Sequence, residues 1–424
     1  MIHRAGRRTP INRPSMTNPS GIPDSSVPHK PLSGLKVVDF TRFLAGPYCA
    51  QLLGDLGAEV VKVERPGEGD PTRVQGPPFH HGNGLSYYAT NRNKRSITLD
   101  MQQEEGQKIA RQLCLRADVV VENFRRDVMP RLGLDYESLA RENPRLIYAS
   151  ISGFGADGPD ADLGAFDLTI QAVGGYMSIC GEQDGEPIKL GTSAFDMVAG
   201  MSCHSAILAA LYQRTSSGVG QKVETSLLEA EVAFLLDAAM GYFLTGQEPR
   251  KWGSEHALQV PYKAFKTIDG WAVIGAGFQN LFEGLCNVLG RRDLMLDHRF
   301  ATPANRVAHR NELYDILDAE IAERSTATLI EALQESKVPC APVNTIRQVF
   351  ENRQVLHRGM RQTLHHPEYG DIPSLGAAAK YSSFDVTTGW TAPPRLGEDS
   401  EEVLRRWLDM NAAKIDALRA SSVI

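Results

Sequence analysis

Short apolar runs alternate with helix-like segments between residues 35 and 151, and this alternation restricts the possible folds more than any other feature of the sequence. The expected strands are 35–40, 60–64, 95–99, 118–122 and 146–151. The expected helices between them are 46–56, 106–116 and 136–142. Strands that alternate with helices form a parallel sheet with helices on both faces. The sequence therefore predicts an α/β fold with a large Rossmann-like, parallel-sheet domain.

The carboxyl ends of the expected strands carry the side chains that point to a ligand, because ligands of parallel sheets bind there. These ends hold arginines, an aromatic residue and glycines: Arg42, Arg65, Asn123-Phe124-Arg125 and Gly153-Phe154-Gly155. Such a set suits a phosphorylated, purine-bearing ligand. The ligand is not expected to be NAD, because Leu44-Ala45-Gly46-Pro47 lacks the G-x-G-x-x-G that lets backbone approach a pyrophosphate.

The composition disfavours several classes of protein. With 42% hydrophobic and 23% charged residues, the 424-residue chain has the balance of a globular protein with a sizeable core. No apolar run reaches the roughly 18 residues of a membrane span, and a net charge of −6 disfavours a nucleic-acid binder. The six cysteines and 11 histidines form no C-x-x-C or H-E-x-x-H motif. We therefore expect no metal, no membrane and no nucleic acid, and a reducing compartment.

Shifts in composition divide the chain into parts. The N-terminal stretch is rich in arginine and has Asp24 as its only acid, which predicts a disordered leader that directs the protein to the mitochondrial matrix. The alternatives are an ordinary extension of a cytoplasmic protein, or a translation start at Met16. The expected parts are a leader at 1–33, the first part of the large domain at 34–245, a linker at 246–262, a smaller α+β domain at 263–336, a linker at 337–350, and the second part of the large domain at 351–424.

A glycine-rich stretch followed by a long apolar-faced helix carries the candidate catalytic acid. After Asp196, apolar residues recur at helical spacing at Met197, Met201, Leu208 and Leu211. Asp196 therefore lies where the helix begins, and the macrodipole favours its ionised form by about 0.3–1 kcal/mol. A carboxylate held in this way can attack an activated carbonyl. The alternative is that Asp196 is only the N-cap of the helix. A second apolar helix is expected at 227–244.

Several short motifs occur in the order and at the spacing of a known family. They are Asp39-Phe40-Thr41, Ala45-Gly46-Pro47, 54–60, 63–67, 93–96, 121–124, 153–155 and 394–398. Through these motifs the chain, from Pro31 to about Leu408, resembles the class III CoA-transferases, which include formyl-CoA transferase and the α-methylacyl-CoA racemases. Within that family it is similar to the succinyl-CoA:dicarboxylate branch, which includes succinate–hydroxymethylglutarate CoA-transferase, through 251–256, 260–267 and 355–357.

The resemblance implies a site, a substrate class and an assembly. The nucleophile of the family matches Asp196. The positions that contact CoA in the family match Arg65, Leu99, Asn123, Phe124 and Arg131. The substrates are implied to be CoA thioesters, with no permanently bound cofactor and no metal. The family also implies a large domain split around the small one by long linkers, and an interlocked homodimer.

Two departures from the family's patterns bear on the reaction. Racemases use a His–Asp pair 30 positions apart, and 30 positions before Asp196 this chain has Phe166, which cannot shuttle a proton. The glutamine of the formyl-CoA branch is Leu44 here, which disfavours oxalate or formate as acceptor. The leading interpretation is CoA transfer from succinyl-CoA to a dicarboxylate such as glutarate, hydroxymethylglutarate or itaconate. The alternatives are an acyl-CoA racemase or isomerase, and a CoA-binding protein without turnover.

A dicarboxylate needs a cation for its second carboxylate, and arginine suits that planar group. The candidates are Arg42 and Arg73, with an ion pair to a neighbouring acid as the alternative for each. Phe166 is expected at the substrate site because of its position in the family's pattern. His256 and Tyr262 lie in the segment expected to approach the site from the small domain.

Overall fold

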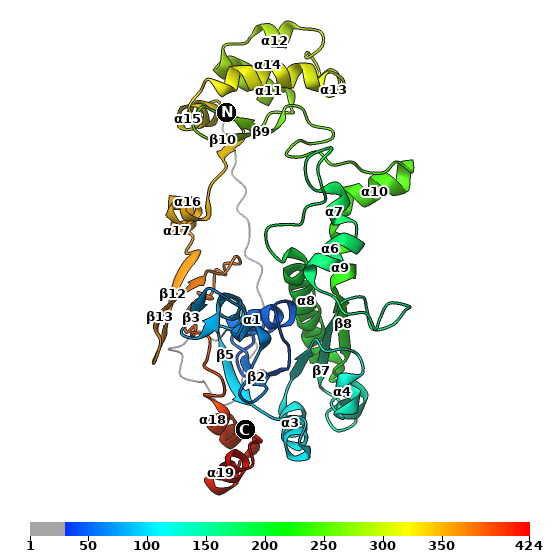
Figure 1. The fold of residues 1–424 in the computed structure, drawn as a ribbon, viewed down its shortest axis with the longest axis vertical. Coiled ribbons are helices and arrows are strands. Elements are labelled where there is room, and N and C mark those ends of the chain that lie inside the picture. Colours follow the sequence, from blue (N-terminus) through cyan, green and yellow to red (C-terminus); the bar gives the residue numbers. More distant parts are fainter. Residues whose placement is uncertain (1–29) are drawn as a thin grey trace, which may run out of the picture.

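The computed structural model describes residues 30–424 (Figure 1). The leader expected at 1–33, and the mitochondrial location that depends on it, lie outside the described residues except for the last four positions. Lys30 contacts the large domain, because its Nζ donates to the main-chain oxygens of Asp55 and Val386 at 3.2 and 2.8 Å. Leu32 is buried.

A six-stranded parallel sheet forms the centre of the large domain, as the alternation of strands and helices predicted. The strands are β1 (Lys36–Asp39), β2 (Glu59–Glu64), β5 (Lys94–Thr98), β6 (Val119–Glu122), β7 (Ile147–Ser152) and β8 (Lys222–Ser226). Their order is β5-β2-β1-β6-β7-β8, so the strand order reverses at the β1–β6 pair. Ligands of open α/β sheets bind in the crevice at such a switch point. The edge strand β8 was not predicted, because its sequence is polar and contains no apolar run.

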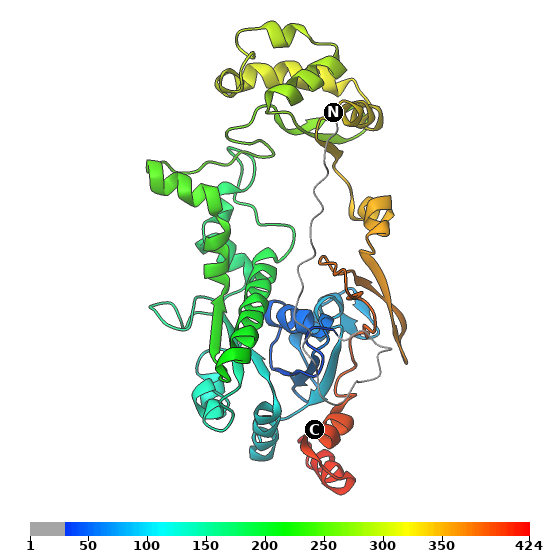
Figure 2. The same cartoon turned by 180° about the vertical axis from the view of Figure 1, so that it is seen from behind.

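Helices cover both faces of the sheet, and each face has its own hydrophobic core. The helices on one face are α3 (Glu104–Arg116), α5 (Tyr136–Ala140), α18 (Ser400–Leu408) and α19 (Ala412–Ala420). Those on the other are α1 (Ala45–Asp55), α8 (Ala194–Ser217) and α9 (Leu227–Phe234). Figure 2 shows the C-terminal helices, in red, close to α3 in cyan, so the chain returns to the large domain after the small one.

Helix α8 is long and apolar, with a mean hydropathy of 1.4 over its most apolar 18-residue window, which meets the length and composition of a membrane span. It packs against α1, α9 and the strands β7 and β8, and its residues Ala199, Cys203 and Ile207 are fully buried. These contacts are those of a core helix in a large domain.

The second apolar helix predicted at 227–244 is two helices, which corrects that prediction. α9 ends at Phe234 and α10 (Leu236–Thr245) begins two residues later. Leu236 has a φ of +42°, a left-handed conformation that interrupts the helical hydrogen bonds. Residues 230–240 contain no glycine or proline, so the sequence gives no local signal for the break.

The small domain combines a three-stranded antiparallel sheet with helices around a separate core (Figure 1). Its strands are β9 (Tyr262–Lys266), β10 (Trp271–Gly275) and β11 (Cys340–Pro342). Its helices are α11 (Gln279–Leu289), α12 (Asp293–Leu296), α13 (Pro303–Ala308), α14 (Arg310–Ala322) and α15 (Thr326–Glu335). β11 pairs with β10, so part of the stretch expected to be a linker belongs to the small sheet.

Short elements complete the chain and frame the carboxyl ends of the strands. Between β2 and β7 they are η1 (Pro71–Arg73), β3 (Phe79–His80), β4 (Asn83–Gly84), α2 (Leu85–Thr90) and α4 (Val128–Arg131). Before α8 they are α6 (Asp167–Val173) and α7 (Tyr176–Ile179). On the way back from the small domain they are α16 (Ile346–Glu351), α17 (Arg353–His357) and the hairpin β12 (Arg361–His366) and β13 (Gly370–Leu375).

Candidate active site

A cavity of about 1030 Å³ lies at the carboxyl ends of β6 and β7 and reaches the first turn of α8. Its walls come from the loop after β1, the loops after β6 and β7, and the starts of α6 and α8. The cavity lies at the carboxyl ends of the strands, where a ligand was expected, and its wall after β1 adjoins the β1–β6 switch point. A volume near 1000 Å³ is at the upper end of the usual range for ligand pockets and suits a long substrate. Among residues 30–424, no group of three or more His, Cys, Asp or Glu side chains is arranged to hold a metal ion.

Asp196 lies in the first turn of α8 and lines this cavity. It is not the N-cap, because Ser193 occupies that position and makes no side-chain cap. The cap is supplied by Asp167 at the start of α6, whose Oδ1 accepts from the N–H of Phe195 at 2.8 Å and from the N–H of Asp196 at 3.4 Å. The Asp196 carboxylate is therefore not used to cap its own helix, which corrects the alternative stated for it.

The environment raises the pKa of Asp196 to about 7, mainly through burial and secondly through the charge of Asp167. This is opposite to the effect expected from the macrodipole alone. Burial outweighs the macrodipole, and Asp167 adds to the rise in pKa because it already occupies the first amides of α8 and places a second negative charge beside Asp196. The side chain of Gln171 fixes Asp167 by donating to its Oδ2, and accepts from the N–H of Leu190 at 2.9 Å. A carboxylate with a raised pKa is a more basic nucleophile once it is ionised.

A second buried acid, Glu231 of α9, supports the same region. Its Oε1 accepts from the N–H of Tyr176 at 3.1 Å, and burial raises its pKa to about 7. Gly174 allows this approach, since a Cβ at that position would lie 2.5 Å from the Glu231 carboxyl carbon. Tyr176 in turn packs edge-on against Phe195, with ring centroids 5.0 Å apart. The start of α7, which follows the glycine-rich turn, is thus packed directly against Phe195, the residue that precedes Asp196.

Arg42 lies on the loop after β1, next to the cavity-lining Phe43, but is not itself among the residues that line the cavity. Asn123, after β6, ties this loop to its neighbour by accepting from the Arg42 N–H at 2.9 Å and donating to the Arg42 carbonyl at 2.8 Å. The guanidinium of Arg42 lies over the ring of Phe124 at 4.9 Å, and no acid within residues 30–424 forms an ion pair with it. Burial lowers its pKa, so an anionic ligand beside it offsets the cost of its desolvation.

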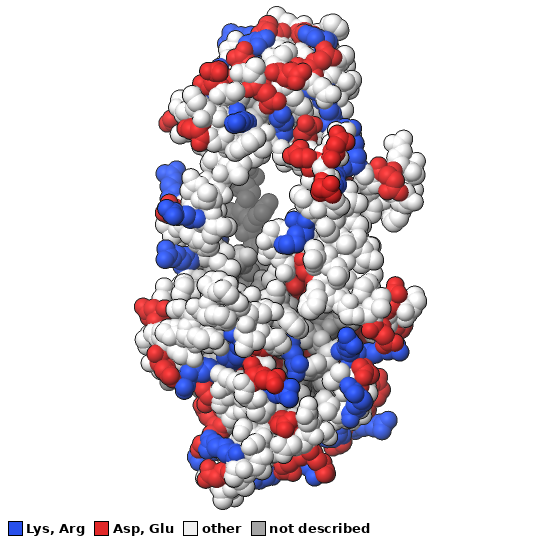
Figure 3. Space-filling view, viewed as in Figure 1, with Lys and Arg blue, Asp and Glu red and all other residues white. Residues whose placement is uncertain are grey.

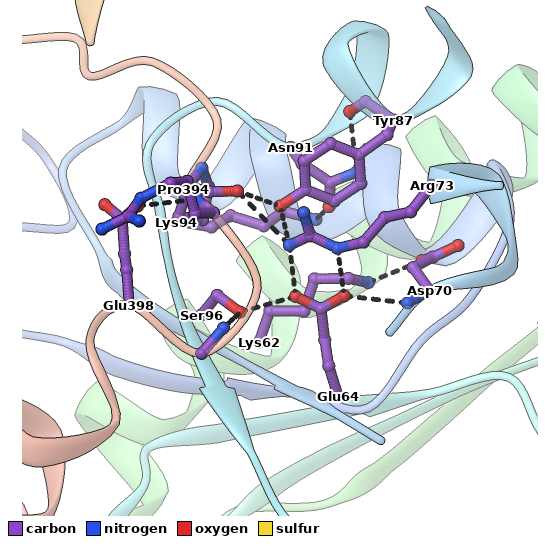
Figure 4. A network of polar contacts seen from close by, with 12 residues as sticks. Lys62, Glu64, Asp70, Arg73, Tyr87, Asn91, Lys94, Ser96, Pro394 and Glu398 are labelled. Carbon is purple, nitrogen blue, oxygen red and sulfur yellow. Dashed lines mark hydrogen bonds and ion pairs between the residues drawn. The ribbon is translucent and has the colours of Figure 1, made fainter. Parts of the chain in front are cut away.

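The guanidinium of Arg73, unlike that of Arg42, is already paired with an acid, which corrects its assignment as a carboxylate binder. It is almost fully buried, and Nη2 and Nε donate to the two carboxyl oxygens of Glu64 at 2.7 and 2.8 Å (Figure 4). Nη2 also donates to the Tyr87 hydroxyl at 2.6 Å, and Nη1 to Asn83 at 3.1 Å. Arg73 therefore forms the ion pair that was its stated alternative.

The five positions expected to contact CoA fall into three groups. Asn123 and Phe124 line the cavity. Arg65 and Arg131 are exposed, and each forms an ion pair with an acid nearby in the sequence. Leu99 is only 1% exposed and packs in the core beneath the sheet, so its side chain is not available to a ligand.

The remaining candidates lie in two places. Phe166 lines the cavity, is 63% exposed, and meets Phe43 edge-on with ring centroids 5.6 Å apart. His256 and Tyr262 lie together where the chain enters the small domain, with ring centroids 5.5 Å apart, and do not line the cavity of the same chain. Glu231 was missed as a functional support, since it acts across a long sequence separation that leaves no local pattern.

Comparisons with known proteins identify the family. Residues 32–400 match the model of CoA-transferase family III. The chain is 39% identical over 395 residues to succinyl-CoA:glutarate CoA-transferase of Mus musculus, covering 93% of this chain and 90% of that one. It is 41% identical over 381 residues to succinate–glutarate CoA-transferase of Agrobacterium fabrum, covering 88% and 95%.

A solved structure agrees with these sequences. The crystal structure of a CAIB/BAIF family protein from Brucella suis superposes with a TM-score of 0.82 at 39% identity, covering 89% of this chain and all of that one. The resemblance seen in the motifs is thereby confirmed. This chain belongs to CoA-transferase family III, a family of enzymes.

Proposed function

We propose that this enzyme transfers CoA from succinyl-CoA to a dicarboxylate of the glutarate type, through a covalent intermediate on Asp196. The observation that carries the proposal is the Asp196 carboxylate, which faces a large cavity and is freed from capping by Asp167. The relatives from mouse and Agrobacterium are a succinyl-CoA:glutarate and a succinate–glutarate CoA-transferase, which supports this pair of acids.

The proposed reaction exchanges one thioester for another and needs no external energy source. An Asp196 oxygen attacks the thioester carbonyl of succinyl-CoA, the C–S bond breaks, and CoA leaves as a thiolate, which gives a mixed anhydride. The thiolate attacks the aspartyl carbonyl, forms an enzyme-bound thioester and releases succinate. The acceptor carboxylate then attacks this thioester and the two steps run in reverse, which returns Asp196 as a carboxylate.

Each of these intermediates reacts with water, so the chain must limit access to Asp196. Burial of Asp196 supports this requirement, and it also makes the ionised acid more basic than a carboxylate in water. Asn123 and Phe124 line the same cavity and are proposed to contact CoA.

We assign the second carboxylate of the acceptor to Arg42. Its guanidinium is half-buried, lies over the ring of Phe124 and forms no ion pair within residues 30–424, whereas that of Arg73 is fully engaged by Glu64, Tyr87 and Asn83. The Arg42→Met protein should lose binding of diacids relative to monoacids, because a desolvated arginine–carboxylate contact is lost. An Arg42→Met protein with unchanged selectivity would refute this assignment.

We also propose that the enzyme works as an interlocked homodimer. α9 and α10 expose apolar side chains that a second copy would cover, namely Val232, Phe234, Leu236, Met240, Phe243 and Leu244. Figure 3 shows that the molecule is hollowed between its small and large domains, where another chain can pass. Sedimentation should give twice the chain mass at micromolar concentration, and a monomer that transfers CoA at the full rate would contradict the proposal.

The deciding experiment incubates the protein with succinyl-CoA and a panel of diacids and identifies new thioesters by mass. Glutaryl-CoA or a related C4–C6 thioester is expected, and Asp196→Ala should abolish it. A racemase is disfavoured because Phe166 occupies the position of the proton-shuttling His, and deuterium wash-in at the α-carbon without transfer would favour it instead. Binding of CoA without any product would favour a non-catalytic CoA-binding protein.

A further inference from the structure

Phe43 has a backbone conformation that a bulky residue rarely adopts. Its φ is +64°, in the left-handed region that glycine and asparagine tolerate and that costs a phenylalanine energy. It lies between the end of β1 and the start of α1, next to the cavity that holds Asp196. A conformation of this kind persists only where the surrounding contacts impose it.

A buried ionic network at the ends of β1 and β2 imposes it; Figure 4 shows its Lys62–Asp70 ion pair. Asp70 accepts from the Phe43 N–H at 3.3 Å and pairs with Lys62 at 2.9 Å. Lys62 donates to the Thr41 carbonyl at 2.7 Å, and Asp39 accepts from the Thr41 N–H at 2.8 Å. The side chains of Lys62 and Asp70 are at most 1% exposed, so these contacts are shielded from water and hold the loop firmly.

The close packing of α1 on α8 places this loop beside the catalytic acid. A Cβ on Gly200 would lie 2.6 Å from the carbonyl oxygen of Ala45, so only glycine permits the observed approach. Asp196 and Gly200 are one helical turn apart and share a face of α8. The face that carries Asp196 is therefore the face that meets the Phe43–Ala45 loop.

The ring of Phe43 meets that of Phe166 edge-on, with centroids 5.6 Å apart and planes at 87°. Both residues line the cavity together with Asp196, and Phe166 is 63% exposed although it is a large apolar side chain. An aromatic pair in which Phe43 is half-buried and Phe166 is exposed provides an apolar surface that a ligand can cover.

We propose that Phe43 and Phe166 together form the apolar wall of the acyl subsite, where they contact the methylene chain of the bound acid and determine which chain lengths and branches the enzyme accepts. This inference rests on the proposed transfer reaction. The wall touches the carbon chain between the two carboxylates, one of which reacts with Asp196 while the other pairs with Arg42. It also shields the acylated aspartate from water.

The test uses Phe43→Gly, Phe43→Ala and Phe166→Ala with saturating succinyl-CoA and unbranched diacids of four to eight carbons. Phe43→Gly removes the ring and suits the left-handed backbone, so it separates loss of the wall from loss of the fold. Each variant should shift the ratio of kcat/KM for the eight-carbon acid to that for the five-carbon acid by about tenfold or more, the usual discrimination of a hydrophobic pocket. Hydrolysis of succinyl-CoA relative to transfer should rise as well.

Phe79→Ala is the matched control, because Phe79 lies on β3 outside this cavity and is half-exposed. It should leave the ratio unchanged. Ratios that stay within twofold of the native value in both Phe43→Gly and Phe166→Ala would overturn the inference. A change confined to the KM of succinyl-CoA, measured in a separate series at a fixed concentration of the five-carbon acid, would overturn it too, since the variants would then affect only the donor. If the native enzyme transfers CoA to none of the diacids, the proposed function itself fails.

Discussion

Replacing Asp196 with asparagine should stabilise the fold while it removes activity. The pKa of this acid rises from its ordinary value of 3.8 to about 7 in the folded protein. At about 1.36 kcal/mol for each pH unit, the shift corresponds to about 4 kcal/mol. Because Asp196 is partly exposed, solvent screening reduces the expected gain to roughly 2–4 kcal/mol at pH 8.

The direction of this change in stability follows from the linkage between proton binding and folding. The folded state keeps the proton of Asp196 up to pH 7, whereas the unfolded chain loses it near pH 4, so ionisation in the folded state costs stability as the pH rises between these values. Asparagine has no proton to lose. The stability gained by Asp196→Asn should therefore be small near pH 4, grow up to about pH 7 and level off above it.

Urea unfolding of both proteins at several pH values and one protein concentration measures this difference. Asp237→Asn is the matched control, because Asp237 is an exposed acid in the first turn of α10. Its replacement should cost about 0.3–1 kcal/mol through loss of the macrodipole contact. A pH-independent difference for Asp196→Asn, or a loss of stability at pH 8, would refute the reasoning.

Three further predictions concern residues around the site. Asp167→Asn keeps the cap of α8 but removes the charge beside Asp196, so the pKa of Asp196 should fall. The pH below which kcat/KM declines should therefore be lower than in the native enzyme, and an unchanged pH profile would contradict this. Arg73→Met leaves Glu64 buried and unpaired, so it should cost about 3–5 kcal/mol in urea unfolding without changing acceptor selectivity. Gly200→Ala drives a methyl group against the Ala45 carbonyl, so it should cost about 1–3 kcal/mol and slow transfer; wild-type values would mean that α8 can shift freely.

The parallel sheet and the position of Asp196 were predictable because both depend on local patterns. Apolar runs and helical periodicity mark the strands and the start of α8, and periodicity does not depend on distant contacts. The edge strand β8 was not predicted because its polar sequence contains no apolar run.

What escaped prediction depends on contacts between distant residues. Asp167 caps a helix that begins 27 positions further along the chain, so no short sequence motif predicts this cap. Arg42 and Arg73 are the same residue type at the same edge of the sheet, and only burial and partners distinguish a free guanidinium from one fixed by Glu64. The raised pKa of Asp196 likewise comes from its surroundings and not from its place in a helix.

Trapping the intermediate tests the central claim most directly. The native enzyme, turning over succinyl-CoA and a diacid, would be treated with hydroxylamine and mapped by peptide mass spectrometry. Covalent catalysis predicts a hydroxamate on Asp196 that forms only during turnover, and a fall in rate of about 1000-fold or more in Asp196→Ala. An unmodified Asp196 during sustained turnover, or an Asp196→Ala protein that transfers CoA at the native rate, would contradict it.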